Sequence, residues 1–183
     1  MINANPKPSG VKVPKRNILA IRQIASNTRR LFDVHDPYAD AINILEFKLP
    51  QYGVTYDICD KSELGDDHGL TIPDQGIIKI REDVYCGACE GNGRDRFTIF
   101  HEIGHLIMHS GVPLARTQNS SNDHKWVEDS EWQANTYAAE FMMPVEHIKA
   151  LCKTPNDVSR QFGASFDASV MRLNKLRKQK IIK

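Results

Sequence analysis

The sequence lacks long apolar segments and an excess of charge of either sign. No stretch reaches the about 18 consecutive apolar residues of a transmembrane helix, and the first ten residues, MINANPKPSG, hold no apolar core of a signal peptide. Lys and Arg total 24 against 23 Asp and Glu, which gives a net charge of +1. This balance excludes a global field that would draw the molecule to nucleic acid or to an anionic membrane. We expect a cytoplasmic protein without a membrane partner.

Cysteine is also scarce, with four residues: Cys59, Cys86, Cys89 and Cys152. In a reducing compartment we expect free thiols rather than a disulfide scaffold. Cys86 and Cys89 form a CxxC motif, which is typical of half a zinc site or of a redox pair. No second CxxC and no nearby Cys-His pair completes such a site. We therefore interpret the motif as two thiols in a turn.

The rest of the composition is that of a globular protein. The 183 residues are 40% hydrophobic and 26% charged, and a chain of this length can bury a core. Residues 1–14 contain three prolines and a glycine and are predicted to form a tail or an extended arm. We predict a core domain over residues 15–150 and a small helical segment over residues 151–183.

Hydrophobic periodicity predicts an α+β fold. Apolar residues recur at helical spacing in four segments: residues 15–31, 39–49, 94–109 and 127–143. Three shorter segments have the pattern of strands: residues 54–58, 70–72 and 77–81. The simplest arrangement is a small antiparallel sheet packed on the helix of residues 94–109 and on the helix that follows it. Two short helical patterns around Gly163 predict a helical C-terminal tail.

The motif that carries chemistry is HExxH, at residues 101–105 of an apolar helix, FTIFHEIGHLIMH. Positions i and i+4 differ by about 40° in rotation and roughly 6 Å in rise, so His101 and His105 leave one helix face and can bind one Zn²⁺. Glu102 is turned by about 100° from His101, which suits a general base beside the metal. Gly104 would let another element approach closely. The alternative is two buried histidines without a metal.

A catalytic zinc needs a third protein ligand. His109 continues the series but lies about 12 Å along the helix from His101, too far for the same ion, so we interpret it as a helix-end residue or an outer support. In the next helix, Glu131 shares a face with small alanines that permit close contact, and it is the predicted third ligand. Glu128 is a weaker alternative. Glu140 points the opposite way and is expected to face solvent.

These residues resemble a known family. The stretch RDRFTIFHEIGHLIMH, the ExxAN motif of residues 131–135 and the segment TYAAEFMMP closely resemble the ImmA/IrrE family of zinc metallopeptidases. The resemblance is strongest from Ile77 to Pro144. The tail VSRQFGASFDASVMRL is similar to the helical segment that follows the catalytic core in that family.

The resemblance implies a zincin-like minimal metallopeptidase core. It implies one Zn²⁺ bound by His101, His105 and Glu131, with Glu102 as the general base. It also implies a protein substrate, a helix-turn-helix repressor whose cleavage switches on phage, mobile-element or stress genes.

Three further expectations concern the site. The oxyanion of peptide hydrolysis needs a donor besides the metal, and Tyr137, His124 and Arg96 are the candidates. An exposed edge of the small sheet would hold the substrate as an added strand. Cys86 and Cys89 precede the metal helix, so a regulatory thiolate at the open position of the metal is the alternative to an inert turn.

Two other functions stay open. The spacing of Val158, Phe162, Gly163, Val170 and Leu173 is similar to a helix-turn-helix, and residues 168–183 contain six Lys or Arg and no acid. A packed terminal helix with a solvated basic face is the favoured interpretation over direct DNA binding. The second alternative is a regulatory or toxin–antitoxin module with structural zinc that binds a repressor or DNA without proteolysis. A structural site would not need a base at Glu102.

Overall fold

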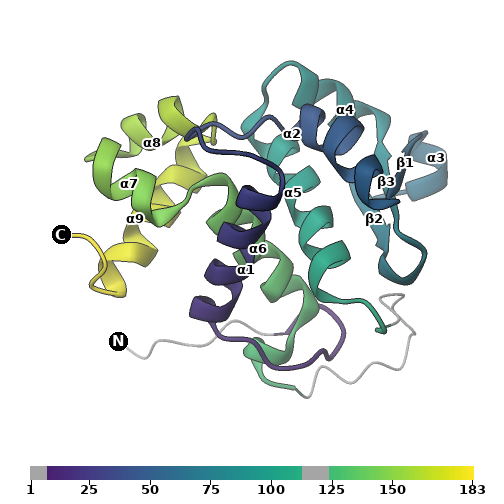
Figure 1. Cartoon of the computed structure of the whole chain (residues 1–183), viewed down its shortest axis with the longest axis horizontal. Helices are drawn as coiled ribbons and strands as arrows, with labels where there is room; N and C mark the ends of the chain where they lie inside the picture. The colour runs from purple at the N-terminus through teal and green to yellow at the C-terminus, as the bar shows by residue number, and fades with distance from the viewer. Residues whose placement is uncertain (1–7, 113–123) are drawn as a thin grey trace.

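Three helices form the centre of the fold: α1 (Ile18–Leu31), α5 (Gly93–Met108) and α6 (Ser130–Met142). The computed structural model describes residues 8–112 and 124–183 (Figure 1). Both α5 and α1 pack against α6. The C-terminal helices lie at one end of this group: α7 (Val145–Leu151), α8 (Pro155–Phe162) and α9 (Phe166–Lys178). In the described part of the chain, no helix is long and apolar enough to cross a membrane.

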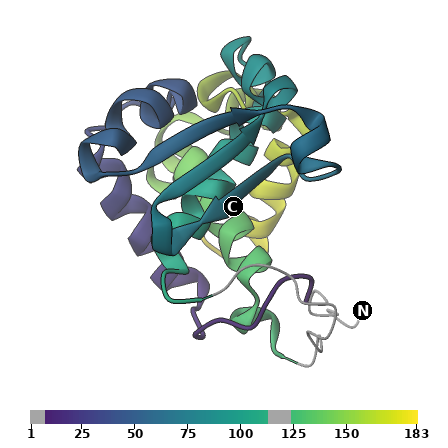
Figure 2. The same cartoon turned by 90° about the vertical axis from the view of Figure 1, so that its right-hand side faces the viewer.

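A three-stranded sheet lies on the other side of α5, away from the C-terminal helices (Figures 1 and 2). Its strands are β1 (Thr55–Cys59), β2 (Gly69–Ile72) and β3 (Ile77–Arg81), in the order β1-β3-β2. The α+β fold class is therefore confirmed. Edge strand β2 packs next to α5, and the central strand β3 buries Ile78 and Ile80.

The pairing of β1 differs from the prediction of an antiparallel sheet. β2 and β3 form the expected antiparallel hairpin, whereas β1 pairs with β3 in parallel. The reason is the connection after β1: α3 (Lys61–Leu64) and the following loop carry the chain past the site of β3 to the far edge. The hairpin then returns β3 between its neighbours, so the sheet is mixed. Strand periodicity predicts which face is buried but not the direction of a partner strand.

The helices begin where the local sequence caps them. The Asn92 side chain accepts hydrogen bonds from the amides of Arg94 and Asp95 and starts α5. Asp129 accepts from the amide of Trp132 and starts α6, which is three residues later than predicted because residues 126–128 form a 3₁₀ turn. Between α1 and β1, the predicted second helix is a succession of α2 (Ala41–Asn43), a π-type turn (residues 44–48) and a 3₁₀ turn (residues 49–52).

The CxxC motif lies on a helix and not in a turn, so that prediction is wrong. Helix α4 (Glu82–Cys89) contains both Cys86 and Cys89, and both are exposed. Three glycines in the segment CGACEGNG suggested a turn, but Gly87 allows α4 to lie against α5, because a side chain there would collide with Asp95. Acidic residues in the first turn of α4 also favour a helix.

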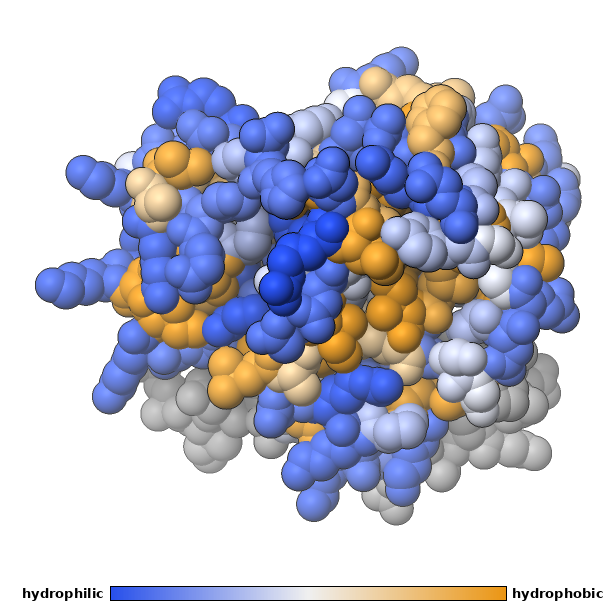
Figure 3. All heavy atoms as spheres, in the orientation of Figure 1, coloured by the Kyte–Doolittle hydropathy of each residue, from blue (hydrophilic) through white to orange (hydrophobic). Residues whose placement is uncertain are grey.

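The C-terminal helices belong to the same hydrophobic core as α5 and α6. Val158, Phe162 and Leu173 are almost fully buried in it. On the face shown in Figure 3, hydrophobic residues occur in separate groups between hydrophilic ones. This distribution is usual for a folded domain whose main apolar surface is internal.

Glu140 is buried, which contradicts the expectation that it faces solvent. Its carboxylate accepts two hydrogen bonds from Arg172 of α9, at 2.8 and 2.6 Å, and two from Arg22 of α1, at 2.9 and 3.1 Å. The periodicity of α6 shows that Glu140 is opposite Glu131 but not that α1 and α9 cover that side. Burial raises the pKa of Glu140, and the hydrogen bonds from Arg172 and Arg22 lower it by more, so the group stays ionised.

We predict that Glu140→Gln lowers the free energy of unfolding at pH 7 by about 3–5 kcal/mol, because it leaves two partly or fully buried arginines without their counter-charge. Since the pKa of folded Glu140 lies below its ordinary value, the difference from the parent should shrink as the pH falls through that pKa. Denaturant unfolding at several pH values measures this. Glu146→Gln, at an exposed position, is the control and should change stability by less than about 0.5 kcal/mol.

Candidate metal centre

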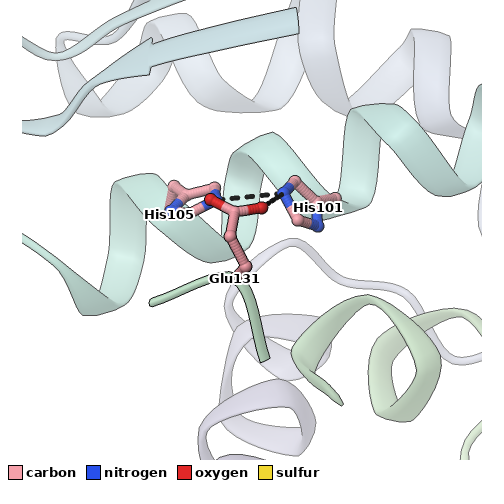
Figure 4. Close-up of side chains that lie close together, drawn as sticks. All are labelled: His101, His105 and Glu131. Carbon is pink, nitrogen blue, oxygen red and sulfur yellow. Dashed lines mark hydrogen bonds and ion pairs between the residues drawn. The ribbon is translucent and has the colours of Figure 1, made fainter. Parts of the chain in front are cut away.

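The HExxH helix and α6 bring three potential ligands together at one point. His101 and His105 project from α5, and Glu131 projects toward them from the first turn of α6 (Figure 4). The two imidazole Nε2 atoms lie 3.0 Å apart, and each is 3.3 Å from an oxygen of Glu131. A tetrahedral ion with bonds of about 2.0–2.1 Å requires ligand atoms about 3.3 Å apart, so the three side chains fit such an ion.

The electrostatics of this cluster keep the carboxylate ionised. Burial raises the pKa of Glu131, but hydrogen bonds from His101 and His105 hold it far below its ordinary value. Burial lowers the pKa of His101, and the interactions with Glu131 and Glu102 raise it by more. A carboxylate with two imidazole nitrogens is the donor set that a divalent cation needs.

The tautomer of His101 is set by α6. Its Nδ1 lies 3.1 Å from the side-chain oxygen of Asn135, which can only accept a hydrogen bond. The proton of neutral His101 therefore resides on Nδ1, and the lone pair of Nε2 faces Glu131 and the ligand cluster. Support of this kind orients metal-binding histidines in many proteins.

A longer chain of hydrogen bonds sets the tautomer of His105. Its Nδ1 lies 3.0 Å from Nδ1 of His109, whose Nε2 is 3.3 Å from Oε1 of Gln133. The amide nitrogen of Gln133 donates to the carbonyls of Pro14 and Val127, so Oε1 must accept from His109. Neutral His109 then accepts from His105 and leaves the His105 Nε2 lone pair free for a metal. Burial and the neighbouring His105 lower the pKa of His109 to about 4, which keeps it neutral.

Glu102 is held by β2, which no sequence pattern indicated. Its Oε2 lies 2.7 Å from the hydroxyl of Thr71, and the side chain is nearly buried. Gly69 leaves the space for it, because a Cβ there would lie 2.8 Å from Cγ of Glu102. The glycine and the threonine, two residues apart on one strand face, thus fix the carboxylate of the predicted base.

The three ligands and Glu102 line one open cleft with a volume of about 600 Å³. β2 forms one wall, and α5 and α6 form the others. The lining residues are Asp67, His68, Gly69, Leu70, Thr71, Phe97, Thr98, His101, Glu102, His105, Glu131 and Asn135. A catalytic site must be accessible to substrate, and this cleft provides that access.

Arg96 does not line the cleft, so the structure does not support it as an oxyanion donor. It is buried on the opposite side of α5, about 140° around the helix from His101. Its guanidinium lies over the Tyr38 ring, 3.9 Å from the centroid. It donates to three backbone carbonyls, those of Ala39, Phe162 and Gly163. Arg96 therefore joins α5 to the turn between α8 and α9.

The other two expected donors are also outside the cleft. Tyr137 is fully buried and stacks on Phe141, with ring centroids 5.7 Å apart, because it lies about 120° around α6 from Glu131. The Nε2 atom of His124 lies 3.1 Å from Asp129 and helps to hold the start of α6. None of the three expectations is supported by the position of the side chain.

The alternatives for metal binding and regulation are not brought to the site either. The Glu128 carboxylate accepts from the amide of Lys125 and is not part of the ligand cluster. Cys86 and Cys89 do not line the cleft, and the structure does not support a thiolate at the open metal position. His109 supports His105 from a buried position and does not face the cleft.

His68 is a cleft residue that sequence reasoning missed. Its Nδ1 lies 3.0 Å from Nη2 of Arg81, which can only donate, so neutral His68 carries its proton on Nε2. Arg81 is itself fixed by Asp83 and by the carbonyls of Gly65 and Asp67. Within the described residues the Nε2–H has no partner. A lone histidine in a loop gave no signal, because its partner is 13 residues away on β3.

Comparisons with known proteins decide the family. The profile of a peptidase family described as the IrrE N-terminal-like domain matches residues 42–174. The chain belongs to this family. The match runs from α2 into α9 and includes the ligand cluster and Glu102, so it agrees with the resemblance of the HExxH and ExxAN segments. Membership implies a metallopeptidase and hence a metal at a cluster of this kind.

One solved structure of similar fold is a Mycobacterium tuberculosis transcriptional regulator. It shares 18% identity over 84% of this chain, with a TM-score of 0.57, which shows a common fold. The present chain spans 46% of the length of that protein. The comparison with curated proteins found no match.

We predict that His109→Phe weakens zinc binding about 10- to 100-fold, because it removes the acceptor that orients His105. Competition with a chromophoric chelator measures the dissociation constant, and circular dichroism checks the fold. His35→Phe, at an exposed histidine outside the site, is the control and should bind zinc like the parent. An unchanged zinc affinity of the His109 variant would contradict the hydrogen-bond chain.

Proposed function

We propose that the protein is a zinc-dependent endopeptidase that cleaves a helix-turn-helix repressor to derepress phage, mobile-element or stress genes. The observation that carries the enzyme assignment is the combination of the ligand cluster with Glu102 in an accessible cleft. A structural metal site would not require a carboxylate fixed beside it. The predicted division into an arm (1–14), a peptidase core (15–150) and a helical segment (151–183) is part of this proposal.

Zinc is the proposed metal because two imidazoles and one carboxylate, with a position left open, are a common catalytic zinc donor set. When bound, the ion would polarise a water molecule and the carbonyl of the substrate. His101, His105 and Glu131 would hold it, each in the protonation state that the surrounding hydrogen bonds favour.

Glu102 is the proposed proton carrier. Thr71 binds Oε2, which fixes the carboxylate and leaves Oε1 next to Gly69 without another described partner. Glu102 would accept the proton of the attacking water and then deliver it to the leaving amine. Because the Glu102 side chain is nearly buried, few other proton donors or acceptors can reach its carboxylate.

The free edge of β2 is the proposed site for the peptide backbone. His68 and Leu70 turn their backbone groups toward β3, as the bond from the Arg81 amide to the His68 carbonyl and the strand register show. In an antiparallel pair the backbone N–H and C=O groups of every second residue point away from the partner strand. The backbone groups of Gly69 and Thr71 are therefore free to face the cleft. A substrate strand can add there, beside Glu102.

His68 is the proposed donor to the substrate carbonyl oxygen, in place of the three donors that the structure excludes from the cleft. The hydrogen bond from Arg81 to Nδ1 places the proton of neutral His68 on Nε2, and His68 immediately precedes Gly69, the first residue of edge strand β2. A donor oriented before the reaction stabilises charge on an oxyanion without reorganisation.

We predict that His68→Phe lowers kcat about 100- to 1,000-fold with little change in KM, because the lost hydrogen bond forms with the transition state. Zinc affinity should stay within twofold of the parent. Asp67→Asn, at an exposed position of the same cleft, is the control. A rise in KM alone would show that His68 only binds substrate.

The repressor as substrate is supported by the sequence resemblance to the ImmA/IrrE family. The alternative is a non-catalytic regulatory or toxin–antitoxin module that binds a repressor or DNA. The six basic residues between 168 and 183 are the reason to test DNA binding as well, although Arg172 is paired with Glu140. Salt-sensitive binding of duplex DNA by the purified protein would support that alternative.

We predict that Glu102→Gln retains one zinc per chain and cleaves at least about 100-fold more slowly, because the proton carrier is lost. The assay incubates the zinc-loaded protein with a candidate helix-turn-helix repressor, such as one encoded nearby, with and without a chelator, and identifies products by mass spectrometry. Cleavage by the Gln variant at the parental rate would contradict the mechanism. Zinc binding without cleavage by the parent would favour the binding module.

A further inference from the structure

The amino-terminal arm, defined here as residues 9–16, lies along the segment that leads into α6. The amides of Ser9 and Gly10 donate to one carboxylate oxygen of Asp129, at 3.0 and 2.8 Å. Val11 exchanges two hydrogen bonds of 3.0 Å with Ser130, one to its side chain and one from its amide. The arm continues with bonds from the amides of Val13 and Arg16 to the carbonyls of Glu128 and Val127. These bonds tie the arm to residues 127–130, which lead into α6.

The arm contacts a metal ligand directly at Gly10. This glycine is buried, and a Cβ on it would lie 2.8 Å from Cγ and 2.8 Å from the amide nitrogen of Glu131, and would also collide with the hydroxyl of Ser130. The backbone at Gly10 therefore forms a wall against which the Glu131 side chain rests. Only a residue without a side chain permits that distance.

The arm reaches a second ligand through Gln133. The carbonyl of Pro14 accepts from the Gln133 amide nitrogen at 2.9 Å, and Arg16 donates to Gln133 Oε1 at 3.2 Å. These contacts fix the orientation of the amide that receives the His109 proton, and His109 in turn orients His105. The arm thus determines which Gln133 atom faces the histidines.

We propose that the arm is a positioning element of the metal centre, acting on Glu131 through Gly10 and on His105 through Gln133 and His109. The arm lies outside the residues that match the family profile, 42–174, so family membership does not assign it this role. The inference rests on the metal-binding part of the proposed function but not on peptide cleavage. It makes residues 9–16 a determinant of metal affinity.

The test compares zinc dissociation constants of the full-length parent, Gly10→Ala and Lys12→Ala, measured by chelator competition without any substrate. We expect Gly10→Ala to weaken zinc binding about 10- to 100-fold, because the added methyl group displaces the arm from Glu131. Lys12→Ala alters an exposed side chain of the same arm and should bind zinc within twofold of the parent. Thermal unfolding of the metal-free proteins separates affinity from stability.

Gly10→Ala with lower stability but parental zinc affinity would overturn the proposal, since the arm would then be only a structural element. A parent that binds no zinc would instead refute the metal centre itself. Hydrogen exchange of the unaltered protein covers the case in which the variant fails to fold. Coupling is reciprocal, so zinc should slow exchange of the amides of residues 9–11 together with those at the start of α6. Identical exchange in residues 9–11 with and without zinc would also overturn the proposal.

Discussion

The close approach of α5 and α6 is the constraint on which the rest of the structure depends. Gly104 faces α6 between the two histidines, and a Cβ there would lie 2.9 Å from the Tyr137 ring and 3.3 Å from Cα of Ala134. Because the helices touch at this point, Glu131 on α6 comes within 3.3 Å of both His101 and His105 on α5. A bulkier residue at position 104 would separate the helices and move the carboxylate away from the imidazoles.

Buried polar groups fix α6 relative to its neighbours at both ends. Near its C-terminus, Glu140 binds Arg22 and Arg172, and Arg29 of α1 donates to the Phe141 carbonyl at 2.9 Å. At its start, Asp129 and the following residue receive the arm. Leaving any of these groups unpaired is costly inside a protein, which favours one position of α6 over others. These buried ion pairs and hydrogen bonds therefore help to hold α6 in the position that brings Glu131 to the two histidines.

Local patterns predicted the parts of this site that lie within one helix. The 3.6-residue repeat placed His101 and His105 on one face, and the same repeat placed Glu131 among the alanines of α6. The family resemblance was confirmed by the profile match. What failed depends on contacts between distant segments: the direction of β1, the burial of Glu140, and the positions of Arg96 and Tyr137. Glu102 of α5 is held by Gly69 and Thr71 of β2, and the tautomer of His68 is set by Arg81 of β3. These contacts join different elements, so no local repeat encodes them.

The most direct test of the proposed metal centre is the coordination shell of zinc in the loaded protein, measured by X-ray absorption spectroscopy. We predict one zinc per chain with nitrogen and oxygen neighbours at about 2.0–2.1 Å, two of them imidazoles, and no sulfur. Loss of the carboxylate in Glu131→Gln should alter this shell. A sulfur neighbour at about 2.3 Å, which only a cysteine or methionine can supply, or the absence of stoichiometric zinc, would contradict the assignment of His101, His105 and Glu131 as the metal centre.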